Sequence, residues 1–191
     1  MENTTMENTR TKTTRNSLIL LLTAAIWGMA FVSQSKGMDY MHPFTFNGVR
    51  SLIGAASILV YILISRKIAG DKAAPLDWKL NVKAGLLCGI FLTIASTLQQ
   101  FGIKYTSVGK AGFITTLYII FVPMFGIFLK KKVAPVVWAA AVMAAVGMYL
   151  LCMTESLRLG AGDIMVFLCA IAFAIQIMTV DHYAARIDGA V

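Results

Sequence analysis

Six long apolar runs, nearly free of charge, fill most of the chain after a polar N-terminal segment. Each run is close to the ~20 residues that a helix needs to cross ~30 Å of hydrocarbon. The runs are continuous and do not alternate as the strands of a membrane barrel would, and in hydrocarbon a helix satisfies its own backbone. We therefore expect an all-α polytopic membrane protein. Its six transmembrane helices are predicted over 17–35, 43–65, 84–103, 111–129, 133–154 and 164–180.

The charge distribution predicts how the chain is oriented in the membrane. Hydrophobic residues make up 58% of the sequence and charged residues 14%, against about 25% charged in soluble domains. The Lys and Arg residues between the runs gather on one side, which carries both chain ends, so we expect a plasma (inner) membrane protein with its N-terminus and residue 191 in the cytoplasm. The net charge of +8 is then a topology signal with lipid contact as a by-product, and no nucleic acid partner is expected.

Three local features carry further structural expectations. Residues 1–16 are rich in Thr and Asn and lack apolar periodicity, which predicts a disordered cytoplasmic tail. Pro123 removes a backbone donor within the fourth run and should kink that helix. Small residues in the second and fifth runs are expected to let helices approach closely. These small residues are Gly48, Ser51, Gly54, Ala55, Ala140, Ala144 and Gly147.

Polar and aromatic side chains recur at helical spacing inside several runs. They either line a polar cavity between helices or make interhelical hydrogen bonds with no ligand. The cavity is favoured for the set as a whole, because several helices carry such a stripe. The candidate cavity residues are Trp27, Phe31, Gln34, Arg50, Gln99, Gln100, Tyr118 and Gln176.

Arg50 is the one charge well inside a predicted span. It could attract an anionic substrate or a carboxylate from another helix. It could equally extend its head group toward the membrane surface. The sequence leaves both alternatives open.

Catalytic chemistry finds little support in the sequence. The two histidines, His42 and His182, fall on opposite sides of the membrane in the predicted topology. No paired acids and no metal-ligand spacing occur, so we expect no catalytic residues, no metal site, no cofactor and no enzyme. An integral-membrane enzyme and a small channel or assembly subunit remain as alternative functions.

Three stretches resemble one transporter family. They are Trp27-Gly28 followed by Phe31, Asn47-Gly48-Val49-Arg50, and the segment LQQFGIKYTSVGKAGFITTLYIIFVPMFG that begins at Leu98. Together they are similar to EamA-type transporters of the drug/metabolite transporter superfamily. This resemblance implies ten helices in two five-helix repeats of opposite orientation, with the substrate held between the repeats.

The resemblance also implies a division of the chain and a function. Residues 17–151 would form the first repeat, and 152–191 an outer hinge and the first helix of an incomplete second repeat, with Phe173 opposite Trp27. The other four helices would lie outside this chain, which is expected to be a fragment. The implied function is a carrier that exports or exchanges a small metabolite or drug-like solute by alternating access, inactive as the fragment. Its partners would be the solute and the lipid bilayer, with a homodimer as an open alternative.

Overall fold

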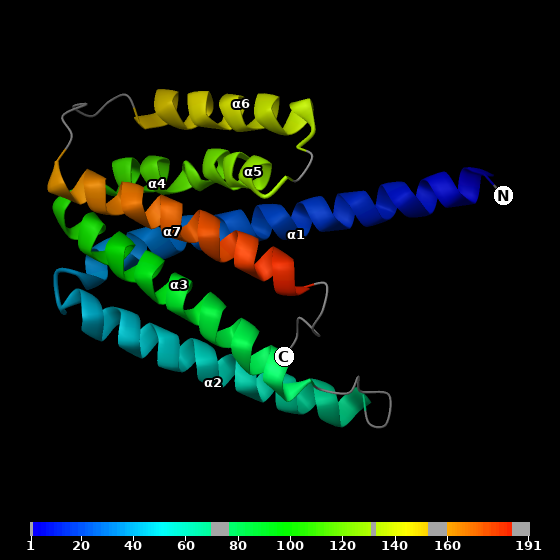
Figure 1. Ribbon diagram of the computed structural model, residues 1–191, viewed down its shortest axis with the longest axis horizontal. Helices are drawn as coiled ribbons and strands as arrows, with labels where there is room; N and C mark the ends of the chain where they lie inside the picture. The colour runs from blue at the N-terminus through cyan, green and yellow to red at the C-terminus, as the bar shows by residue number, and fades with distance from the viewer. Residues whose placement is uncertain (1, 70–76, 131–132, 153–159, 185–191) are drawn as a thin grey trace.

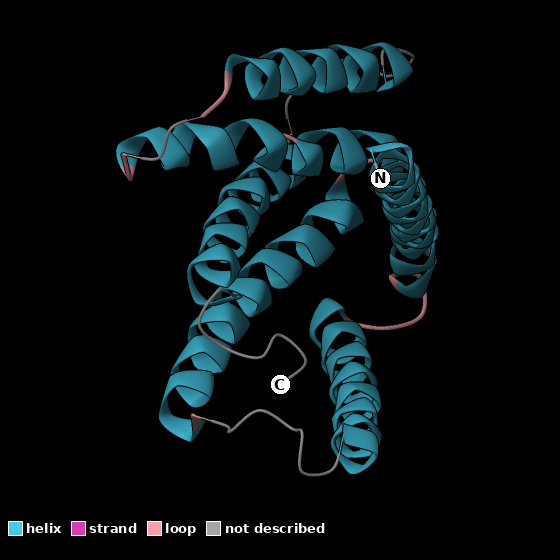
Figure 2. Cartoon of the chain, turned by 90° about the vertical axis from the view of Figure 1, so that its right-hand side faces the viewer, coloured by secondary structure: helices cyan, strands magenta, loops and turns pink. Residues whose placement is uncertain are grey.

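The computed structural model describes residues 2–69, 77–130, 133–152 and 160–184. The regular elements within these ranges are helices, with no strand among them (Figures 1 and 2). This confirms the all-α polytopic fold. The helices are α1 (Glu2–Gly37), α2 (Pro43–Ala69), α3 (Trp78–Tyr105), α4 (Val108–Thr116), α5 (Tyr118–Phe128), α6 (Pro135–Cys152) and α7 (Ala161–Ala184).

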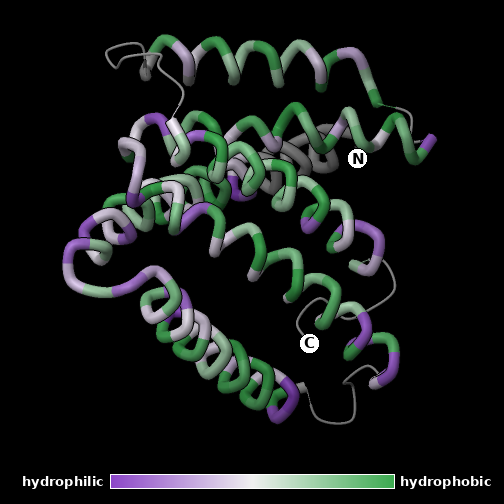
Figure 3. Tube along the Cα trace, turned by 60° about the vertical axis from the view of Figure 1, so that its left-hand side comes forward, coloured by the Kyte–Doolittle hydropathy of each residue, from purple (hydrophilic) through white to green (hydrophobic). Residues whose placement is uncertain are grey.

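The predicted spans correspond closely to these helices. Among the described residues, five stretches have the length and composition to cross a membrane, and α6 contains a shorter apolar stretch over Pro135–Gly147. Hydrophobic residues dominate the middle of the helices, whereas hydrophilic residues gather at their ends and turns (Figure 3). The five stretches are Thr14–Gly37, Pro43–Ile68, Trp78–Tyr105, Val108–Phe128 and Ala161–Ala184.

The N-terminal segment differs from its prediction. Instead of a disordered tail over 1–16, α1 is helical back to Glu2. The physical reason is cooperativity: once an apolar helix is nucleated, each added residue gains a hydrogen bond at little cost. The segment also contains Met, Glu, Arg and Lys, which are good helix formers.

Successive spans run in opposite directions, so the bundle has two distinct ends (Figure 1). We name them the Asp163 end and the Asp77 end. The Asp163 end carries the α1–α2 turn, the α3–α4 turn and the start of α7. The Asp77 end carries the start of α1, the start of α3 and the end of α7. The start of α1 and the end of α7 therefore lie at the same end of the bundle (Figure 1).

The buried core lies toward the Asp163 end. In α3 every buried residue except Ala84 lies at or beyond Ala95, and in α7 the buried residues run from Gly162 to Ala174 apart from Tyr183. α1, α3 and α7 converge there and diverge toward the Asp77 end (Figure 1). From Leu18 onward α1 presents many exposed apolar side chains, as does α2, which suits contact with lipid.

The closest helix contact joins α3 to α7 and depends on two glycines. A Cβ at Gly102 would lie 2.4 Å from Val166 Cγ2, and a Cβ at Gly162 would lie 2.8 Å from the carbonyl oxygen of Gly102. Neither position can hold a side chain without a shift. The glycines predicted for close packing, Gly48, Gly54 and Gly147, have no neighbour within 4 Å of such a Cβ. For these three glycines the prediction was wrong within the described part of the chain, because helical spacing identifies a small-residue face but not the helix that meets it, whereas Ala144 on α6 does lie against α4 and α5.

The fourth predicted span is broken at Leu117 and not at Pro123. Leu117 separates α4 from α5, while α5 continues through Pro123. Just before the break, the Thr116 hydroxyl donates to the carbonyl of Gly112 at 2.7 Å. Such bonds to the preceding turn often bend helices. The Leu117 N–H then bonds to Ile114 in a tighter turn.

Candidate functional site

A group of buried polar side chains joins α1, α3 and α4 toward the Asp163 end. Gln99 Nε2 donates to Thr115 Oγ1 at 3.3 Å, and Gln100 Nε2 donates to the Gln34 carbonyl at 3.3 Å. Gln34 is 4% exposed, and Gln100 is fully buried. We refer to the four residues of these two hydrogen bonds together as the glutamine group: Gln34, Gln99, Gln100 and Thr115.

Two oxygen atoms of the glutamine group lack partners. Gln34 Oε1 and Gln100 Oε1 are buried and accept no hydrogen bond from the described residues. A buried acceptor without a donor is costly, and native proteins contain few of them. The group therefore has unused capacity to accept hydrogen bonds.

An aromatic group lies between α1, α5 and α7. The ring of Phe173 is 6.3 Å from that of Trp27 and 6.4 Å from that of Tyr118, centroid to centroid, both at inclined angles. Phe173 is buried against Ala95 and Cys169. Phe173, which the sequence aligns with Trp27, is thus in direct contact with it. The aromatic group provides an apolar surface between the helices, with Trp27 half-exposed.

The other candidates lie outside these two groups. Phe31 is half-buried and packs against Ile103 and Val166, as a core residue does. Gln176 is half-buried on α7, about one turn beyond Phe173.

Arg50 makes its contacts within α2. Its Nη2 donates to Asn47 Oδ1 at 3.1 Å, and its guanidinium lies 5.9 Å from the centre of the Phe46 ring. Asn47 in turn is buried and donates to the carbonyl of Ser96 on α3 at 3.1 Å. Arg50 itself is exposed, and Asn47 links it to Ser96, about one turn before Gln99 and Gln100 on α3.

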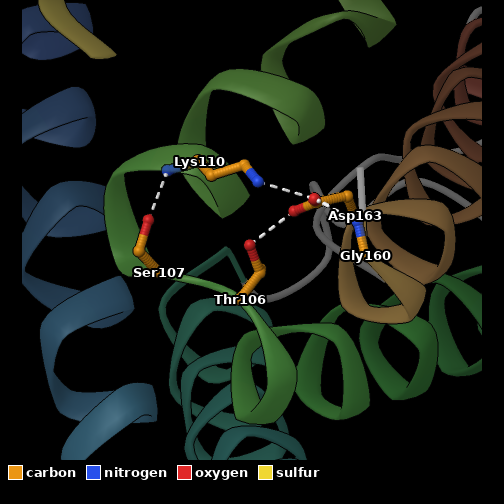
Figure 4. Close-up of polar contacts among 5 residues, drawn as sticks. All are labelled: Thr106, Ser107, Lys110, Gly160 and Asp163. Atoms are coloured by element: carbon orange, nitrogen blue, oxygen red, sulfur yellow. Dashed lines mark hydrogen bonds and ion pairs between the residues drawn. The ribbon is translucent and has the colours of Figure 1, made fainter. Parts of the chain in front are cut away.

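An ion pair at the Asp163 end was not predicted. Lys110 Nζ on α4 lies 2.6 Å from Asp163 Oδ2 on α7. The Thr106 hydroxyl also donates to this carboxylate, as does the Gly160 N–H at 2.9 Å (Figure 4). Ser107 caps the start of α4 by accepting from the Lys110 N–H. The available signal was that both charged residues follow hinges on the same predicted side of the membrane.

Metal chemistry has no visible basis in the described ranges. No cluster of three or more His, Cys, Asp and Glu residues occurs there. His42 lies in the turn before α2 and His182 near the end of α7, at opposite ends of the bundle.

The apolar bundle with a polar and aromatic interior defines the class: a multi-pass membrane protein. The chain belongs to the EamA-like transporter family, whose model matches residues 15–153. It is also 31% identical over 171 residues to a protein of Archaeoglobus fulgidus described as an uncharacterized transporter. That match covers 86% of this chain and 48% of the relative, so the chain spans about half the relative's length. No solved structure matches the chain.

Proposed function

We propose that this protein forms part of a carrier that exports or exchanges a small metabolite or drug-like solute by alternating access. Its substrate would occupy the region between α1, α3, α5 and α7. There the aromatic group supplies surfaces for apolar contact and the glutamine group supplies hydrogen bonds. Pockets for small molecules commonly combine an apolar lining with a few placed polar groups.

The contact between Trp27 and Phe173 is the observation that carries the proposal. In an inverted repeat, equivalent residues that touch each other must lie close to the axis relating the two repeats. Transporters of this architecture hold their substrate at the repeat interface near the membrane midplane. α1 and α7 run in opposite directions, as equivalent helices of inverted repeats should (Figure 1). The 6.3 Å contact therefore supports a substrate position at the centre of the membrane.

Coupling to a proton would need an ionisable group inside the membrane. Along the described spans the acidic side chains lie near helix ends, at Asp163 and Asp181, and Asp163 is already paired. We infer either an exchanger or facilitator, or a coupling group contributed from outside the first repeat. The basic hinges favour a cytoplasmic location for the Asp77 end in the inner membrane.

Solute counterflow with the full-length protein tests the proposal. The protein is reconstituted in liposomes preloaded with an unlabelled metabolite mixture, and uptake of individual labelled solutes is followed. A carrier exchanges at least one solute saturably, and the trapped label exceeds its equilibrium level. Flux that rises linearly with concentration, without counterflow, would contradict a carrier and favour a channel.

A further inference from the structure

The ion pair at the Asp163 end is a contact that can be broken and remade. Lys110 lies within the stretch that the family model matches, and Asp163 lies beyond it, so the pair joins α4 to a helix outside that stretch. The Lys110 side chain is still 20% exposed, which places its ammonium group beside water. An ammonium group in such a position can exchange a carboxylate for water at a small cost in free energy.

The Asp163 carboxylate keeps other hydrogen bonds when Lys110 is taken away. It accepts from the Gly160 N–H at 2.9 Å and from the Thr106 hydroxyl (Figure 4). Thr106 directly follows Tyr105, whose backbone lies in the crossing of α3 and α7. These two donors therefore belong to the contact between α3 and α7 and not to α4. Separating α4 from α7 removes one partner of the carboxylate without leaving a bare buried charge.

The junction of α4 and α5 is a tight turn at Leu117. The Leu117 N–H donates to the Ile114 carbonyl at 3.2 Å, and the Leu117 carbonyl accepts from the Ile120 N–H at 2.9 Å, the spacing of a 3₁₀ turn. Such a stretch within a longer helix often marks a hinge. A small cavity lies beside this turn, and its lining on α6 is alanine: Ala141, Ala144 and Ala145. Because these neighbours are small, the junction is a place where α4 can tilt relative to α5.

α4 covers polar side chains beneath the ion pair. Thr115 follows Lys110 by five residues, about 7.5 Å along the helix. It is 3% exposed and accepts from Gln99 Nε2 at 3.3 Å. Its side chain also hydrogen-bonds Cys169 on α7. Moving the start of α4 away from α7 would therefore open these side chains to the Asp163 end.

We propose that α4 is a hinged gate at the Asp163 end of the carrier, which turns at Leu117 and is held closed against α7 by the Lys110–Asp163 ion pair. This inference rests on the proposed carrier function and adds a moving element to it. In the structure the gate is closed, and Thr115 and Gln99 beneath it are buried. In the open state Lys110 is hydrated, α3 and α7 stay packed at their glycines, and the polar side chains under α4 are reached from the Asp163 end.

Crosslinking to Cys169 tests whether α4 must move. Thr115→Cys places a thiol on α4 against Cys169, and Ala95→Cys places one on α3 in the same core cluster as Cys169. The other cysteines of the full-length protein are replaced by serine, and counterflow is compared before and after oxidation of each variant. We expect the link between α4 and α7 to lower counterflow about tenfold, reversibly on reduction, and the link between α3 and α7 to leave it unchanged. Full counterflow with completely oxidised Thr115→Cys overturns the proposal, as does an equal loss in both oxidised variants.

Thiol reactivity tests the ion pair without a transport assay. Thr115→Cys is combined with Cys169→Ala, and modification by N-ethylmaleimide is followed in Lys110→Met and in Lys110→Arg, which keeps the charge. We expect Lys110→Met to raise the rate at position 115 about tenfold and Lys110→Arg to leave it unchanged, because only the first removes the partner of Asp163. Cys88 on α3, half-buried and away from α4, is the internal control and should react equally in both variants. Equal rates at position 115 overturn the inference, and so does a parallel rise at Cys88, which would indicate general loosening. The crosslinking test keeps both partners of the ion pair, so it remains decisive if Lys110→Met fails to fold.

The failure of this inference is distinguishable from failure of the proposed function. Counterflow that survives the link between α4 and α7 leaves the carrier in place and shows that α4 is not its gate. Absence of counterflow by the unmodified full-length protein across the whole metabolite panel removes the carrier itself.

Discussion

Asp163 at the start of α7 and Lys110 in the first turn of α4 form an ion pair of 2.6 Å that ties the two helices together at one end of the bundle. The side chain of Asp163 is 2% exposed and that of Lys110 20%. The carboxylate also accepts from Thr106 and from the Gly160 N–H. The buried Asp163 carboxylate stabilises the contact between α4 and α7 only while Lys110 and the other donors are present, because a buried charge without partners is costly.

Removing the carboxylate should weaken this end of the bundle. Asp163→Ala leaves the Lys110 ammonium without its acidic partner, and we expect a loss of about 2–3 kcal/mol, below the usual cost of breaking a fully buried pair because Lys110 is partly exposed. Thermal unfolding in detergent measures the loss. The double variant with Lys110→Ala should recover part of it. Strictly additive losses would show that the two side chains are not energetically coupled.

Gly162→Ala should be much more harmful than a glycine change elsewhere in the bundle. Its Cβ would lie 2.8 Å from backbone atoms of Gly102 and Tyr105, which cannot move independently of α3. We expect a destabilisation of about 1–3 kcal/mol, as for overpacked cores. Gly48→Ala is the control, because its Cβ meets nothing within 4 Å and alanine favours helix. The melting temperatures of the two purified variants are compared. Equal values would contradict the close contact between α3 and α7 at Gly162.

Trp27→Ala and Phe173→Ala should separate substrate binding from stability. Phe173 is 6% exposed, and its removal should cost about 3–5 kcal/mol of stability. Trp27 is 48% exposed, so its removal should lower the melting temperature far less while still weakening solute affinity. Affinity and melting temperature are measured on the same preparations. Wild-type affinity in Trp27→Ala would exclude this ring from the substrate region.

Gln100→Ala should reduce transport about tenfold in kcat/KM while expression is maintained, because the change removes one acceptor and its bond to Gln34. Initial rates in liposomes are normalised to the amount of inserted protein. Asn81→Ala, at the other end of α3, should retain the wild-type rate. Unchanged kinetics in Gln100→Ala would remove this residue from the site.

The fold class and the approximate positions of the spans could be predicted because hydrocarbon imposes one length and one backbone solution on each of them. The glutamine group was also accessible to sequence reasoning, since Gln34, Gln99 and Gln100 are polar residues in apolar surroundings. In these cases the prediction depends only on residues that are close together in the sequence.

Pairings between distant helices could not be predicted in the same way. Gly102 and Gly162 are ordinary glycines in the sequence, and only the crossing of α3 and α7 makes their missing side chains necessary. Lys110 and Asp163 are 53 residues apart in the sequence, and only the fold brings them together. The fourth span is interrupted at Leu117, whereas α5 continues through Pro123, which is the stronger local signal for a break.

The buried residues of α3 are concentrated at the Asp163 end, so any rotation of this helix is expected to pivot there. With 28 residues at about 1.5 Å each, the helix is about 42 Å long. Trp78 lies about 36 Å along the helix from Gly102, so a rotation of about 10° at the glycine crossing would move the far end of α3 by about 6 Å. In the carrier proposed above, a small rotation of α3 at one membrane surface would thus produce a larger displacement at the other.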